Sequence, residues 1–145
     1  MSTPTPTGPT PTPPGGELLP LISLAVEHVF DTLGRQSVFP PTILAVAADG
    51  QRGMWEPPDL EPEQAAATVA KISPRPTRAV AVFDGEIETA DGPRPAVAVE
   101  AFDAAALAST RMVFPYLPGV AAAGIAARVD GDPQVVANGP NPLFG

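Results

Sequence analysis

Residues 78–102 read RAVAVFDGEIETADGPRPAVAVEAF, and this stretch decides the fold. Apolar runs flank the pair Asp91-Gly92, and a second Asp-Gly pair lies at Asp84-Gly85. Asp and Gly both tolerate the positive φ that a tight hairpin turn requires. The stretch therefore predicts antiparallel strands that reverse at Asp91-Gly92. The pattern leaves Asp84-Gly85 open, as either another turn or a bulge within one longer strand.

The same dipeptide recurs outside this stretch, at Asp49-Gly50 and Asp130-Gly131, each time beside a short apolar or alternating run. A two-residue loop at Asp49-Gly50 would place Trp55 opposite Leu44, which gives the only tryptophan a role in the core. Further short strands are expected as far as residue 137. The repeated corners predict an antiparallel β-meander sheet of five to six strands.

Two helices are expected beside this sheet. In residues 17–33 apolar side chains recur at a 3.6-residue period, and Gly34 follows as a stop. The apolar side of this helix comprises Leu18, Leu19, Ile22, Ala25, Val26, Val29, Phe30 and Leu33. A shorter amphipathic segment over residues 61–72 predicts the second helix. The order of elements predicts a single two-layer α+β domain over residues 17–145, with both helices packed on one face of the sheet.

Residues 1–16 differ in composition from the rest, because beyond the first two they are almost entirely Thr, Pro and Gly. Such a segment cannot bury enough apolar surface to offset the entropy lost on ordering. We therefore expect a disordered, partly polyproline-II tail that acts as a spacer. Its Pro-rich turns could alternatively be a ligand for a partner with an aromatic groove.

Composition and charge exclude several classes of protein function. The chain has no cysteine, which excludes disulfides and thiolate chemistry. Eight basic and sixteen acidic residues give a net charge of −8, which opposes binding to nucleic acid or anionic lipid. Neither a signal-peptide pattern nor a run of ~20 apolar residues is recognised, so a cytoplasmic protein without membrane contact is expected. Because no nucleotide-binding motif occurs, no cofactor is expected.

The best candidate for chemistry is a row of carboxylates. Asp84, Glu86 and Glu88 would share one face if their strand is unbroken, and Glu100 could lie close by on the return strand. Several oxygens on one face could hold Mg²⁺ or Ca²⁺. This reading gives an alternative function, a small metal-assisted hydrolase. The preferred interpretation is a solvated strand face.

No residue is assigned a catalytic role. His28 is the only histidine, so a zinc site with two histidines is excluded. No G-x-S-x-G motif is present to form the elbow of a serine nucleophile. We therefore expect a non-catalytic protein rather than an enzyme.

The first helix has more apolar residues than one buried face requires, and this excess favours an interaction module. Leu21, Leu24 and His28 form a second stripe on the first helix, which could contact a partner or a second copy. Arg111 and Tyr116 belong to a Pro- and aromatic-rich strand, and both residue types are enriched at interfaces. The sequence therefore predicts a small acidic accessory module that binds a protein partner or forms a homodimer.

Overall fold

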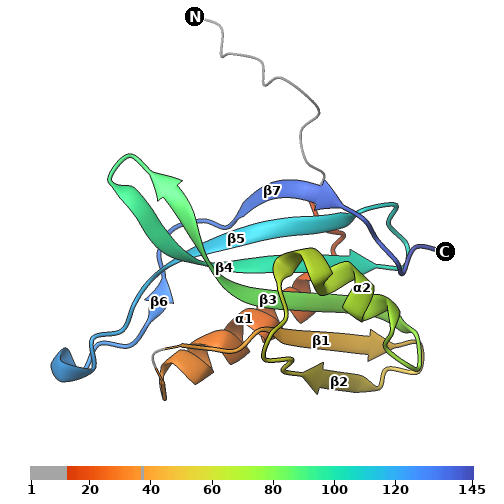
Figure 1. The fold of residues 1–145 in the computed structure, drawn as a ribbon, viewed down its shortest axis with the longest axis horizontal. Coiled ribbons are helices and arrows are strands. Elements are labelled where there is room, and N and C mark those ends of the chain that lie inside the picture. The colour runs from red at the N-terminus through yellow and green to blue at the C-terminus, as the bar shows by residue number, and fades with distance from the viewer. Residues whose placement is uncertain (1–12, 37) are drawn as a thin grey trace, which may run out of the picture.

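The computed structural model describes residues 13–36 and 38–145. Within them, seven strands form one antiparallel sheet, curled as a half-barrel and accompanied by two helices (Figure 1). The elements are, in chain order, α1 (Leu19–Leu33), β1 (Thr42–Ala47), β2 (Arg52–Trp55), the 3₁₀ turn η1 (Pro62–Gln64), α2 (Ala65–Ala70), β3 (Pro76–Thr89), β4 (Gly92–Asp103), β5 (Ser109–Leu117), η2 (Ala121–Ala123), β6 (Arg128–Val129) and β7 (Gln134–Gly139). Neither described helix combines the length and the apolar content needed to cross a lipid bilayer.

The strands follow the order β2-β1-β3-β4-β5, and both β6 and β7 pair with β5. β6 lies opposite the end of β5 and β7 opposite its start, so the two short strands continue one another along the same edge. The predicted α+β class and antiparallel meander are confirmed. The sheet has seven strands rather than five to six, because the two-residue β6 counts as a strand of its own.

The Asp-Gly pairs of the central stretch behave differently from each other. The chain reverses between β3 and β4 at Asp91-Gly92, as predicted, but the two loop residues are Ala90 and Asp91, and Gly92, with a φ of +102°, pairs with Thr89 as the first residue of β4. Asp84-Gly85 lies inside β3, where Asp84 pairs with Val97 and Gly85 with Ala96 without a register shift. Asp84-Gly85 is therefore neither a turn nor a bulge, and β3 runs unbroken to Thr89.

Asp49-Gly50 does reverse the chain, but its loop is one residue longer than expected. Arg52 pairs with Val46 and Gly50 has a φ of +87°, which is the geometry of a three-residue hairpin loop. The extra residue moves Trp55 opposite Ile43 rather than Leu44. A one-residue shift transfers a side chain to the other face of a sheet. The predicted core role of Trp55 is wrong, because this side chain is 41% exposed on the terminal strand.

Asp130-Gly131 lies between β6 and β7, which both run antiparallel to β5. Gly131 has a φ of +97°, so the glycine again supplies a conformation that other residues rarely adopt. The chain does not fold back on itself at this point. Asp130-Gly131 is therefore not a hairpin turn. It connects two short strands that lie one after the other along the same edge of the sheet.

The two helices lie on opposite faces of the sheet, α2 in front and α1 behind in Figure 1. The core beneath α1 contains Val80 and Val82 of β3, whereas the core beneath α2 contains Ala79, Ala81 and Phe83. A strand that is apolar on both faces must be covered on both. The prediction of two layers with both helices on one face is therefore wrong, and the domain has three layers.

The buried side of α1 also differs from the predicted one. Leu21 is 6% exposed and belongs to the core, whereas Leu19 is 49% exposed. Leu18, which precedes the helix, is buried with Leu21, Ile22 and Ala25. Leu21 therefore does not belong to an exposed stripe, and of the two leucines in the predicted stripe only Leu24 is at the surface.

Candidate functional site

The structure separates the four carboxylates that the sequence placed together. Asp84, Glu86 and Glu88 are exposed and alternate along β3, so they share the face that α1 covers further along. Glu100 pairs with Ala81 and points to the α2 face. Among the described residues, no three His, Asp or Glu side chains are placed to hold a metal ion together. The structure therefore does not assemble the ligand set of the hydrolase alternative.

Glu100 is instead part of a local polar network on the sheet. Its side chain is buried, and its Oε1 accepts a hydrogen bond of 2.7 Å from Ser109 Oγ. Its Oε2 accepts one of 2.8 Å from Arg111 Nε. This pairing compensates a buried charge, which would otherwise be costly. Arg111, a predicted interface residue, has a structural role here, although its side chain remains 44% exposed.

Tyr116 joins α1 to the sheet. Its ring meets Phe30 edge to face at a centroid distance of 5.7 Å. Its hydroxyl donates a hydrogen bond of 3.3 Å to Asp84 Oδ1. Burial, the charge of Asp84 and this hydrogen bond all raise the pKa of Tyr116. Because Tyr116 is only 7% exposed, it does not offer a free surface to a partner.

A hollow of about 600 Å³ opens between the end of α1 and residues 118–127. Arg35, Gln36 and Tyr116 are its polar side chains, and the rest of its lining is apolar residues and glycines. Arg35 and Gln36 are exposed, and the Tyr116 hydroxyl is already bound to Asp84. With two exposed polar side chains and a hydroxyl that already has a partner, the hollow carries no ligand assignment.

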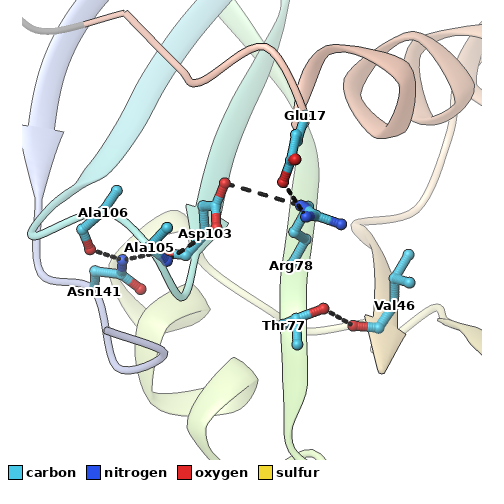
Figure 2. Close-up of polar contacts among 8 residues, drawn as sticks. All are labelled: Glu17, Val46, Thr77, Arg78, Asp103, Ala105, Ala106 and Asn141. Carbon is cyan, nitrogen blue, oxygen red and sulfur yellow. Dashed lines mark hydrogen bonds and ion pairs between the residues drawn. The ribbon is translucent and has the colours of Figure 1, made fainter. Parts of the chain in front are cut away.

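A polar cluster around Arg78 fastens both ends of the described chain to the sheet (Figure 2). Arg78 is ion-paired with Glu17, which precedes α1, and its Nε lies 3.9 Å from Asp103 Oδ2. Near the C-terminus, Asn141 Nδ2 donates hydrogen bonds of 2.8 Å to the Asp103 carbonyl and 2.6 Å to the Ala106 carbonyl. These contacts give the cluster a structural role.

An exposed apolar feature is β2, which ends the sheet along the lower edge of Figure 1. Met54 is 49% and Trp55 41% exposed. Met54 lies opposite Leu44 on the α1 face, and Trp55 lies opposite Ile43 on the α2 face. Large apolar side chains thus flank, on both faces, a strand edge with which no other described strand pairs. Such an edge is a template for pairing with another chain.

Two of the predicted interface residues border this edge. Leu24 is 37% exposed and lines the same surface hollow as Arg52 of β2. His28 Nε2 lies 3.6 Å from Oε1 of Glu56, the residue that follows β2. The outer side of α1 and the α1 face of the β2 edge therefore lie side by side. We define the β2 edge surface as Leu24, His28, Arg52, Met54 and Glu56, together with Trp55 on the opposite face of the same edge.

Reasoning from the sequence missed Met54 and Trp55 as surface residues. One signal was available: the short run that contains them is followed directly by Pro57-Pro58. Prolines cannot donate to a strand ladder and are therefore typical of sheet edges. A strand that ends in two prolines is better placed at the margin of a sheet than in its centre.

No family model matches this chain, and no curated protein or solved structure matches it significantly.

Proposed function

We propose that this chain is a non-catalytic interaction module whose β2 edge accepts an extended protein segment as an additional strand. The observation that carries the proposal is an open strand edge flanked by Met54 on one face and Trp55 on the other. Strand addition of this kind draws affinity from main-chain hydrogen bonds and specificity from alternate side chains.

The main-chain groups of β2 are arranged for such pairing. Gln51 C=O accepts a hydrogen bond of 2.9 Å from Ala47 N–H across the β1–β2 hairpin. Inward and outward groups alternate along an antiparallel strand. The N–H and C=O groups of Arg52 and Met54 therefore point away from β1, toward the free edge. Continued by one residue beyond the strand, the same alternation would direct those of Glu56 the same way. Two alternate residues of β2 thus offer donors and acceptors to an incoming strand, and Glu56 would become a third when the added strand extends the ladder.

Burial of the flanking side chains would stabilise the complex further. Complete burial of a side chain such as Met54 contributes roughly 1.5–3 kcal/mol. Trp55 adds a larger apolar surface on the opposite face. A partner strand should therefore carry apolar side chains on both of its faces where it passes Met54 and Trp55.

A photo-crosslinking amino acid at Met54 tests this proposal in extracts of the cells in which the protein occurs. The matched control carries the same amino acid at Leu107, which is 84% exposed and lies between β4 and β5. We expect a covalent adduct of one discrete mass from position 54 and none from position 107. Absence of an adduct at position 54, or the same adducts at both positions, would contradict the proposal.

A further inference from the structure

The sequence of β2 also points to the identity of the added strand. We infer that it is β2 of a second copy of this chain, paired antiparallel about a two-fold axis that passes between the two Met54 residues. This inference rests on the function proposed above, because it names the partner of the same edge.

Charge complementarity selects this register. Arg52 and Glu56 lie two residues on either side of Met54, carry opposite charges and are both exposed. A two-fold axis at Met54 places each Arg52 opposite Glu56 of the other copy. Opposite charges across a strand pair are favourable, and like charges are unfavourable. The edge is therefore complementary to itself.

Other symmetric registers lack this match. The free main-chain groups belong to Arg52 and Met54 of β2, and to Glu56 when the dimer extends the strand by one residue, so an axis at any of these three positions gives hydrogen-bonded pairs. An axis at Arg52 would bring the two arginines together, and an axis at Glu56 would bring the two glutamates together. An axis at Gly53 or Trp55 leaves Arg52 and Glu56 without a charged partner. Only a two-fold axis at Met54 pairs Arg52 of each copy with Glu56 of the other, which gives two pairs of opposite charge.

The side chains on the two faces suit the same arrangement. On the α1 face, the two Met54 side chains would meet, and Leu24 of each copy would border them. On the α2 face, Trp55 lies over Gly53 of its own strand, where a Cβ atom would collide with the indole. In the proposed register each Trp55 also lies opposite Gly53 of the other copy, so two bare glycines leave room for two indoles.

Pro57 and Pro58 explain why the pairing stays short. Inward and outward groups alternate, so Pro58 would be the next residue to face the free edge after Glu56. Proline has no N–H to donate, so the ladder ends at the Arg52–Glu56 pairs. The result is a small interface and a dimer that forms on the order of micromolar concentrations or above.

Charge exchange at positions 52 and 56 tests the register. Sedimentation equilibrium is run from about 5 to about 500 μM, a range chosen for a small interface. An ionic strength of about 0.1 M screens the long-range repulsion between two chains of net charge −8. We expect wild type to dimerise and R52E or E56R alone to weaken dimerisation at least tenfold. The equimolar mixture of these variants and the double variant R52E/E56R should both recover it.

Each outcome decides the inference. A monomeric wild type, single variants that dimerise like wild type, or a mixture that stays monomeric would overturn it. The exposure of both positions makes folding of the variants expected, and circular dichroism checks it. Crosslinking from position 54 in the purified protein separates this inference from the proposed function. A discrete adduct in cell extract but none in the purified protein would overturn self-pairing and leave the interaction module standing.

Discussion

Tyr116 and Glu100 show how single residues bind the layers of this domain together. The phenol of Tyr116 reaches from β5 to Asp84 of β3, while its ring packs on Phe30 of α1. On the other face of the sheet, Glu100 of β4 joins two residues of β5, Ser109 and Arg111. Acidic, hydroxyl and basic side chains of the kinds found in active sites thus serve here to connect neighbouring strands.

Ionisation of Tyr116 should occur above its ordinary pKa of 10.0, because burial and Asp84 both favour the neutral phenol. As the only tyrosine, it alone determines the absorbance change of phenolate formation in a pH titration. D84N should lower the pKa only partly, because burial remains. E88Q, on the same face further along β3, should leave it unchanged.

The raised pKa of Tyr116 also makes the stability of the fold depend on pH. The folded state holds the Tyr116 proton more tightly than the unfolded state, so the stabilisation from this group is fully present below pH 10.0. It is lost as the pH rises through the folded-state pKa. The free energy of unfolding, measured with urea, should therefore fall more steeply with pH above pH 10.0 for wild type than for Y116F. A phenol that titrates at or below its ordinary pKa would contradict this account.

At the scale of elements, α1 and the β1–β2 hairpin mark the limit of what the sequence predicts. The helix itself follows from its apolar period, but more apolar residues are available than one face needs, so Leu19 and Leu21 compete for the buried side. Packing of Leu18 and Leu21 into the core resolves this choice. Local sequence predicts that the helix exists, whereas tertiary contacts set its rotation.

Turn chemistry is equally local. A positive φ at Gly50 suits both a two-residue and a three-residue loop, so the sequence predicts the hairpin but not the face on which Trp55 lies. The separation of Glu100 from Asp84 was predictable. Once a two-residue turn closes the hairpin before Gly92, Glu100 pairs with an odd-numbered residue of β3 and points away from Asp84.

Two leucines of α1 that differ in burial, Leu21 in the core and Leu24 at the surface, test its rotation. L21A should lower the free energy of unfolding by about 2–5 kcal/mol, because it opens a cavity in the core. L24A, at a surface position, should cost about 0.5 kcal/mol or less. Urea denaturation measured at a low protein concentration, where the chain is monomeric, gives both values. Equally small losses for both variants would show that the helix is rotated as the period alone predicted, and a larger loss for L24A would contradict the observed burial of Leu21.

Across the whole molecule, the two cores are separated by the sheet but built from the same strands. β3 contributes Val80 and Val82 to one core and Ala79, Ala81 and Phe83 to the other. Disruption of either core therefore disturbs the strand on which the other depends. The three layers should behave as one cooperative unit.

The aromatic residues allow this cooperativity to be measured. Trp55 lies on the α2 side of the sheet and Tyr116 on the α1 side. Urea transitions followed by tryptophan fluorescence and by tyrosine absorbance should have the same midpoint. L21A in one core and V69A in the other should each shift both midpoints together. Separate midpoints, or a variant that moves only one probe, would show that the cores unfold independently.

The two-sided burial of β3 also bears on how this sequence can evolve. Between residues 79 and 83 every side chain faces a core, so substitution there is rarely neutral, whereas the exposed carboxylates Glu86 and Glu88, beyond the Asp84 that binds Tyr116, can vary freely. Selection for foldability should therefore preserve the short apolar run and tolerate change in the arm beside it. Homologues, when compared, should share the former and diverge in the latter.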